Sequence, residues 1–348
     1  MHVARRTVVV ISVLLVAFAA VPAAASAYPW PVRPFDEQHP IRAFFGDPRT
    51  VFDEPFQADG VDGTGAFSFH NGVDISAPDG SAVFPVESGI VHSIDASALS
   101  VKSFDGHRSF QYFHVVPAVT NGQLVVAGVT VLGHIQTSYG HVHLSEIDDM
   151  HATNPLIPGH LTPYRDDTRP EVTLLQLRDE SGEAAAPAVV CGRVDVDAEA
   201  FDSQPLPVSG SFAGMPVAPA AVTWKLRTPG GDTILPTTFA VDFRRTLPPD
   251  RDFWKVYARG SYQNAPRFGQ QQFRTMRGRF LYRLASGLDT RRLPDGPYEL
   301  TVTAVDERGN RGSLTRRFWV DNRSRCAPPP PAAAPLPGPP SEGAAQSP

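Results

Sequence analysis

The stretch Gly140-His141-Val142-His143-Leu144-Ser145-Glu146 decides how the first half of this chain is interpreted. Tyr139 and Gly140 are typical of a turn, and Val142 and Leu144 are typical of a strand. Residues two apart in a strand point to the same face, so His141 and His143 would project side by side. Two imidazoles this close suit a metal ligand beside a proton carrier, although a pair of ordinary surface histidines is the commoner explanation.

A second pair of this kind lies upstream, in His70-Asn71-Gly72-Val73-Asp74-Ile75. The spacing of His70 and Asp74 would fit a helix, but Asn-Gly followed by Val and Ile favours a strand, which also places both on one face. An imidazole nitrogen and a carboxylate oxygen are both acceptable ligands for zinc. Taken alone, the pair could be a loop histidine and a turn-capping aspartate. The two pairs together favour a metal site.

Three stretches of the chain resemble motifs of the M23 peptidases, the lysostaphin and LytM-like endopeptidases. They are residues 69–83, which contain His70-Asn71-Gly72-Val73-Asp74, then Tyr112-Phe113-His114-Val115, and finally His141-Val142-His143. The resemblance covers roughly residues 40 to 155. Gln136 and His134 depart from the family pattern, in a place beside the last motif. Neither departure touches the five residues that matter for the chemistry.

The resemblance implies a role for each matching residue. His70, Asp74 and His143 would be the metal ligands, and His114 and His141 would be the catalytic histidines. The implied cofactor is one Zn²⁺ per chain, and the implied fold is an antiparallel-sheet zinc peptidase domain. The family's usual substrate is the peptide portion of peptidoglycan. The remaining histidines lie outside the matched motifs and are given no role.

The N-terminus is typical of an export signal. Arg5 and Arg6 precede an apolar run from Val8 to Val21, and Ala25-Ser26-Ala27 offers small residues for cleavage. We therefore predict a signal peptide over residues 1–27 and a secreted, cell-wall-associated protein that starts at Tyr28. An uncleaved membrane anchor is the alternative, although the apolar run is short. Nothing later in the sequence is long and apolar enough to span a bilayer.

The remaining sequence predicts a mainly β protein of two domains. Short β runs alternate with turns over residues 28–165, the expected M23-like domain. Residues 166–170 suggest a linker. Residues 166–325 alternate apolar and polar positions in long stretches, which is typical of an immunoglobulin-like or fibronectin-like β-sandwich. Residues 326–348 are rich in Pro and Ala and predict a disordered tail. On this division, residues 28–165 would hold zinc without the sandwich.

The second domain contains a basic segment, residues 241–292, with twelve basic and four acidic residues and many aromatics. Residues 28–170 are acidic, with 17 acidic and 7 basic residues. The basic segment could be a solvated face with core aromatics, or a contact with the acidic domain. Alternatively, it could bind an anionic cell-wall polymer, with aromatics stacking on sugars. No nucleic-acid-binding motif is present. Cys191 and Cys326, the only cysteines, could form one disulfide.

Three functions compete on these grounds. The leading interpretation is a secreted zinc metalloendopeptidase that hydrolyses peptide bonds, with peptidoglycan stem or cross-link peptides as substrate. The second is a non-catalytic cell-wall-binding or amidase-activating protein that retains the fold, against which the intact five-residue set argues. The third is a structural surface module built around the sandwich.

Overall fold

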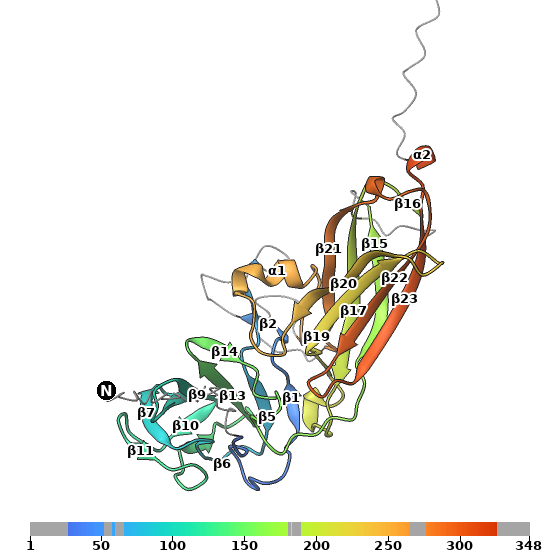
Figure 1. Ribbon diagram of the computed structural model, residues 1–348. Helices are drawn as coiled ribbons and strands as arrows, with labels where there is room; N and C mark the ends of the chain where they lie inside the picture. Colours follow the sequence, from blue (N-terminus) through green and yellow to red (C-terminus); the bar gives the residue numbers. More distant parts are fainter. Residues whose placement is uncertain are drawn as a thin grey trace, which may run out of the picture.

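The computed structural model describes residues 27–51, 58–59, 66–179, 182, 189–264 and 276–325, and these residues form a mainly β, largely antiparallel structure (Figure 1). We refer to residues 27–165 as the N-terminal region and to residues 166–325 as the C-terminal region. No helix in the described part of the chain is long and apolar enough to cross a membrane. The expected signal peptide, apart from Ala27, and the expected tail lie outside the described residues and stay predictions.

The N-terminal region is built on an eight-stranded sheet, with two small sheets beside it. In spatial order the large sheet contains β1 (Ile41–Ala43), β5 (Val73–Ser76), β13 (His141–Asp148), β9 (Arg108–Phe113), β8 (Ala98–Ser103), β7 (Gly89–Ile94) and β11 (Leu124–Val125), and β14 (His151–Thr153) pairs with β13. The small sheets contain β10 (Val115–Pro117), β12 (Gly133–Ile135) and β6 (Ala82–Val83), and β2 (Pro48–Val51), β4 (Ala66–Phe69) and β3 (Ala58–Asp59). The expected alternation of short strands and turns is confirmed, and β8 and β9 form an antiparallel hairpin around residues 105–106.

Alternation along β5 and β13 separates a hydrophobic face from a polar one. The side chains of Val73, Ile75, Val142 and Leu144 are fully buried and belong to the core of the N-terminal region. The residues between them therefore point to the opposite face of the sheet. Gly72 lets β13 approach closely, because a Cβ at this position would lie 2.3 Å from the carbonyl oxygen of Leu144. Sequence alternation thus fixes which side chains gather on the polar face.

The C-terminal region contains two sheets, and most of their buried hydrophobic residues belong to one cluster. One sheet contains β15 (Glu171–Arg178), β17 (Arg193–Ser203) and β18 (Pro216–Val217), with β21 (Leu281–Asp289) paired to β17. The other contains β16 (Val189–Val190), β23 (Arg311–Val320), β22 (Gly296–Val305), β19 (Ala221–Arg227) and β20 (Thr233–Asp242), and β16 pairs with β23 in parallel. The short helices are η1 (Gly210–Phe212), η2 (Asp250–Asp252), α1 (Phe253–Val256), η3 (Thr290–Arg292) and α2 (Asn322–Arg325). The immunoglobulin-like assignment stays a prediction, because many unrelated sandwiches share this architecture.

The hydrophobic core does not follow the predicted boundary at residue 166. Phe45, Phe67 and Phe69 come from the N-terminal region, yet they belong to the core cluster of the C-terminal region. The Phe69 ring lies 5.6 Å from the Phe243 ring and 5.1 Å from the Phe253 ring, measured between centroids. The loop and strands that lead to His70 are therefore packed inside the other region's core.

A buried carboxylate also crosses this boundary. The side chain of Asp47 is 0% exposed and accepts hydrogen bonds from the Phe44 amide at 2.9 Å, the Ala218 amide at 2.7 Å and the Gln263 side-chain amide at 2.9 Å. Two of these donors belong to the C-terminal region. Because a buried polar group that loses its partners is costly, this contact ties the two regions together.

The aromatic side chains of the basic segment are mostly core residues. Phe243, Phe253, Tyr257, Phe280 and Tyr282 are 0% exposed, so these rings are not free to stack on a sugar. Residues 265–275 of this segment lie outside the described residues. Cys191 belongs to a disulfide, but its predicted partner Cys326 also lies outside them, so the pairing stays a prediction.

Candidate metal centre

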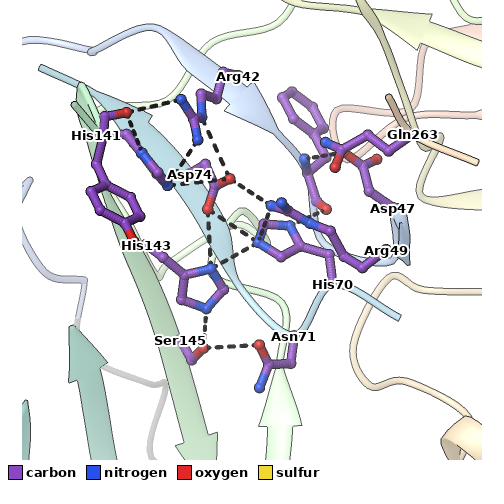
Figure 2. A network of polar contacts seen from close by, with 12 residues as sticks. Arg42, Asp47, Arg49, His70, Asn71, Asp74, His141, His143, Ser145 and Gln263 are labelled. Atoms are coloured by element: carbon purple, nitrogen blue, oxygen red, sulfur yellow. Dashed lines mark hydrogen bonds and ion pairs between the residues drawn. The ribbon is translucent and has the colours of Figure 1, made fainter. Parts of the chain in front are cut away.

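Three of the predicted side chains converge on the polar face of the large sheet (Figure 2). Asp74 on β5 and His143 on β13 are directly opposed in the antiparallel register, and His70 follows the end of β4. His70 Nε2 lies 2.8 Å from His143 Nδ1 and 3.2 Å from Asp74 Oδ1, and His143 Nδ1 lies 3.0 Å from Asp74 Oδ1. All three side chains are buried.

This arrangement fits a tetrahedral metal ion. Ligand atoms about 2.0–2.2 Å from zinc lie about 3.3 Å from one another, close to the three distances found here. Nδ1 of His70 donates to the Phe44 carbonyl oxygen at 2.8 Å, which leaves the lone pair on Nε2. Nε2 of His143 lies 2.7 Å from Ser145 Oγ, whose hydroxyl donates to Asn71 Oδ1 at 3.4 Å, so the lone pair of His143 is on Nδ1. Such outer hydrogen bonds orient metal-binding histidines.

Electrostatics keep this cluster in the state that a metal ion requires. Burial, assisted by the neighbouring Arg49, lowers the pKa of His70 to about 3, so the ring is neutral at pH 7. Burial opposes ionisation of Asp74, but Arg49 and the nearby histidines outweigh it and hold its pKa well below the usual range. Two imidazoles and one carboxylate form a typical zinc ligand set.

The two remaining predicted histidines lie beside this cluster. Nε2 of His141 is 3.6 Å from Asp74 Oδ2, and its Nδ1 donates to the Tyr139 carbonyl oxygen at 2.8 Å. The His114 ring stacks on Tyr139 at 4.3 Å and lies 4.5 Å from the His141 ring. His114 has a φ of 63°, a left-handed conformation that is uncommon outside glycine and is concentrated at functional sites. The structure therefore brings all five predicted residues together.

Both of these histidines are neutral bases. Burial lowers the pKa of His114 to about 3, with a further contribution from His141. Burial also lowers the pKa of His141 to about 4, against the opposing effect of Asp74. Because the Tyr139 carbonyl holds the Nδ1 proton of His141, the basic nitrogen of this ring is Nε2, which faces Asp74.

Two arginines that the sequence analysis did not single out complete the site. Arg49 Nη2 lies 2.5 Å from Asp74 Oδ2 and donates to His70 Nε2 at 2.8 Å. Arg42 Nη2 donates to His141 Nε2 at 3.1 Å, and its Nη1 donates to the Tyr139 carbonyl oxygen at 3.0 Å. Only seven basic residues occur in residues 28–170, and two of them flank Phe45-Gly46-Asp47. The small number of basic residues in this acidic stretch is the sequence feature that could have indicated these two arginines.

Arg49 and a metal ion would compete for His70. The lone pair on His70 Nε2 can serve the Arg49 guanidinium or a metal ion, but not both. The guanidinium is also a fixed positive charge beside Asp74. Loading of the site therefore requires the Arg49 side chain, which is 26% exposed, to leave His70.

The site opens into a cleft of about 1000 Å³ that both regions line. On the N-terminal side the lining includes Arg42, Arg49, Asp79, His114, Tyr139 and His141. On the C-terminal side it includes Pro207, Ser209, Gly210, Ser211, Phe212 and Asn264. The Phe212 ring lies 4.2 Å from the Arg42 guanidinium. The C-terminal region therefore forms one wall of the cleft, which the sequence analysis did not predict.

Glu146 and His160 have a structural position away from this cleft. Glu146 is 0% exposed and accepts hydrogen bonds from the Tyr28 hydroxyl at 2.6 Å and from His160 Nδ1 at 2.7 Å. Glu146 follows His143 by an odd number of residues, so it points to the opposite face of β13.

Comparisons with known proteins give structural neighbours only. No family model matches the chain, and no curated protein does. The catalytic domain of lysostaphin from Staphylococcus simulans is 20% identical, over 32% of this chain and 86% of that chain, with a TM-score of 0.26. A zinc-containing peptidase from Vibrio cholerae is 21% identical, over 37% and 39%, with a TM-score of 0.29. The M23 metalloprotease pseudoalterin is 14% identical, over 46% and 85%, with a TM-score of 0.27. Identities and scores this low assign neither a family nor an activity to the chain.

Proposed function

We propose that this protein is a secreted zinc metalloendopeptidase of the M23 type. One observation carries the proposal: the ligand atoms of His70, Asp74 and His143 lie within 3.2 Å of one another, at the edge of a cleft that also contains His114 and His141. When bound, zinc would act as a Lewis acid that polarises a carbonyl and acidifies a water molecule. His70, Asp74 and His143 would leave a fourth position open for this chemistry.

The residues around the metal ligands would perform the remaining steps. Nε2 of His141 would accept a proton once Arg42 releases it, because Nδ1 is committed to the Tyr139 carbonyl. His141 would then pass this proton to the departing amine, and His114, stacked on Tyr139, would stabilise negative charge on the substrate. Arg42, whose guanidinium lies beside His141 and Phe212, would orient that histidine at the cleft wall.

The substrate that we propose is a peptide of bacterial peptidoglycan, in a stem or a cross-link. The support for this is the resemblance of the three sequence motifs, together with a cleft large enough for an extended peptide. Residues 209–212 of the opposite wall would contact the peptide as well. Secretion follows from the signal-like N-terminus and is proposed on the same footing.

A second function is favoured by one specific observation. Arg49 already satisfies Asp74 and His70 without a metal ion, which is what a non-catalytic wall-binding or amidase-activating protein could use. Two measurements separate the functions: the metal content of the purified full-length chain, and mass spectrometry of peptidoglycan fragments after incubation with it. About one zinc per chain and new peptide ends would support the peptidase. Zinc-free protein that still sediments with cell walls would support the alternative.

A further inference from the structure

Three carboxylates gather at the junction of the two regions, far along the chain from the metal centre. Asp166 follows the last residue of the N-terminal region, Asp202 lies near the end of β17, and Asp306 lies in the turn between β22 and β23. Their side chains are 5%, 1% and 2% exposed. One oxygen atom from each lies within 4.8 Å of the others. Residues 166–170 are thus not the simple linker that the sequence suggests.

Among the described residues, this cluster has no positively charged partner. None of the ion pairs formed within the described ranges of the C-terminal region includes Asp166, Asp202 or Asp306. By contrast Asp197, another buried carboxylate on β17, pairs with Arg178 at 3.0 Å. Charges that are buried without a partner are strongly disfavoured. Either protons or a cation must compensate the three carboxylates.

The hydrogen bonds to the cluster come from neutral groups. Asp166 accepts from the Tyr164 hydroxyl at 3.1 Å and from the Thr168 amide at 2.9 Å, and also from the Thr168 hydroxyl at 2.5 Å. Asp306 accepts from the backbone amides of Arg308 and Asn310, each at 2.8 Å, and from the Asn310 side chain at 2.7 Å. These donors hold both carboxylates in place, but none of them supplies a charge.

Asp202 provides the observation that points to a ligand. Its Oδ1 accepts from the Ser203 amide at 2.8 Å and from the Thr168 hydroxyl at 3.4 Å. Its Oδ2 is buried and has no hydrogen-bond partner among the described residues. Oε2 of Glu307, the residue next to Asp306, is likewise buried and unpartnered in this part of the chain. A buried acceptor without a donor is destabilising, and such an oxygen beside two further carboxylates is suited to bind a cation.

We propose that Asp166, Asp202 and Asp306 bind a calcium ion that fastens the segment leaving the N-terminal region to the two sheets of the C-terminal region. Calcium takes six to eight oxygen ligands at 2.3–2.6 Å, so oxygens on opposite sides of one ion lie about 5 Å apart, which the observed 4.8 Å limit satisfies. No nitrogen or sulfur ligand belongs to the cluster, which disfavours zinc. The smaller magnesium ion demands near-ideal octahedral geometry and usually keeps several waters.

The position of the cluster explains what the ion would do. Asn310 donates to the Asp166 carbonyl oxygen at 2.8 Å, and Arg308 donates to the Leu156 carbonyl oxygen at 2.9 Å. The turn that contains Asp306 therefore already touches the end of the N-terminal region. An ion bound by both Asp166 and Asp306 would hold these two segments together by charge. Asp202 would attach β17, which belongs to the other sheet, to the same ion.

The test measures calcium binding to the full-length chain. Protein dialysed into calcium-depleted buffer is titrated with CaCl₂, and bound calcium is measured by equilibrium dialysis beside the thermal unfolding midpoint. We expect one saturable site, with a dissociation constant of roughly 10⁻⁴–10⁻³ M as in extracellular calcium modules, and a midpoint that rises with calcium. MgCl₂ should give a much smaller rise.

Calcium binding by substituted proteins tests whether the ion binds at this cluster. Asp202→Asn keeps the shape of the side chain and should abolish both saturable binding and the rise in midpoint. Asp197→Asn, which removes a buried carboxylate of the same strand, and His143→Ala, which removes a ligand of the other centre, should retain both. If Asp202→Asn does not fold, Asp166→Asn takes its place.

Three outcomes would overturn the proposal. Wild-type protein that binds no calcium at millimolar concentration would leave protons as the compensating charge. Undiminished binding by Asp202→Asn would place the ion elsewhere. An equal rise in midpoint with MgCl₂ would refute the assignment to calcium.

Discussion

The metal centre and the cluster of Asp166, Asp202 and Asp306, which we call the acidic junction, are both buried groups of hydrogen-bond acceptors. They differ in which groups balance their negative charge and their lone pairs. Beside His70, Asp74 and His143, Arg49 contacts His70 and Asp74 directly, and Arg42 lies 3.6 Å from the Asp74 carboxylate (Figure 2). Within the part of the chain that the structure describes, the carboxylates of Asp166, Asp202 and Asp306 receive only neutral donors. The first cluster can therefore be stable without an ion, whereas the second must hold protons or bind one.

This difference sets opposite costs for ion binding. An ion entering the metal centre must displace Arg49 from His70, so part of its binding free energy is offset by a lost contact. An ion entering the acidic junction would displace nothing but protons and water. Selectivity also differs, because imidazole nitrogens favour zinc and carboxylate oxygens favour calcium.

The largest expected effect comes from removing the region that supports both clusters. A chain truncated to residues 28–165 would expose Phe45, Phe67 and Phe69 and remove two hydrogen-bond donors from Asp47. Losing burial of three aromatic side chains costs several kcal/mol, a large part of the total stability of a domain. We expect the truncated chain to be unfolded or aggregated and to bind no zinc.

Circular dichroism and size-exclusion chromatography of the truncated chain measure this. The sequence-based expectation was that the N-terminal region would hold zinc by itself. A folded, zinc-loaded fragment would restore that expectation and show that the shared core is dispensable.

The next effect separates the two clusters. His143→Ala removes one of three zinc ligands, and we expect at least a 100-fold loss of zinc affinity, above the roughly 10–100-fold typical of outer-sphere changes. His114→Ala is the matched control and should keep zinc while losing turnover. Competition with a chromophoric chelator measures the affinity. Unchanged zinc affinity in His143→Ala would refute the ligand assignment.

A smaller effect concerns the pH dependence of the acidic junction. Burial, with a contribution from Asp166, raises the pKa of Asp202 to about 7, and burial raises the pKa of Glu307 to about 8. A raised carboxyl pKa stabilises the folded state below the unfolded pKa of about 4, and this contribution is lost as the pH rises through about 7. Calcium-free protein should therefore lose stability over this range.

The difference between wild type and Asp202→Asn isolates this contribution from other titrating groups. Denaturant unfolding without calcium should give a difference in free energy of unfolding that changes by on the order of 2 kcal/mol between pH 5 and pH 8. Calcium should remove most of this change. A pH-independent difference would mean that Asp202 stays ionised without an ion.

The smallest effect tests the competition at the metal centre. Arg49→Met removes the guanidinium from His70 and Asp74, so we expect zinc to bind about tenfold more tightly; this is about 1.4 kcal/mol, just below the roughly 1.5–3 kcal/mol of a charged hydrogen bond. The zinc-free variant should be less stable, because Asp74 loses its closest cation. Arg49→Lys keeps a positive charge and is the control. Weaker zinc binding by Arg49→Met would instead make Arg49 a support for Asp74.

The proximity of several of these side chains could be predicted from the sequence because strand alternation determines it locally. His141 and His143 share a face whenever residues 141–148 form a strand, and the register of β5 with β13 then brings Asp74 beside His143. The short strands around them were predictable for the same reason.

Contacts between distant segments were not predictable in this way. Asp166, Asp202 and Asp306 are far apart in sequence and meet only after both sheets have formed. Arg49 was not predicted as a site residue because its side chain is long and flexible. The residues that such a side chain contacts cannot be inferred before the backbone positions are known. The boundary at residue 166 was placed by composition, which carries no information about Phe45, Phe67 and Phe69 packing into the other region.

The close approach of Gly46 and Phe243 restricts how genes for such proteins could recombine. Gly46 has a φ of +92°, and a Cβ built on it would lie 2.5 Å from the Phe243 ring. A glycine in one half of the chain and an aromatic ring in the other are thus a matched pair. Exchange of the second half with that of a diverged homologue would replace the ring's neighbours without adjusting the loop that receives it. The two halves would therefore be expected to evolve as one unit. A chimaera joined at residue 166 would need a glycine at position 46 and a compatible ring at position 243, although these come from different parents.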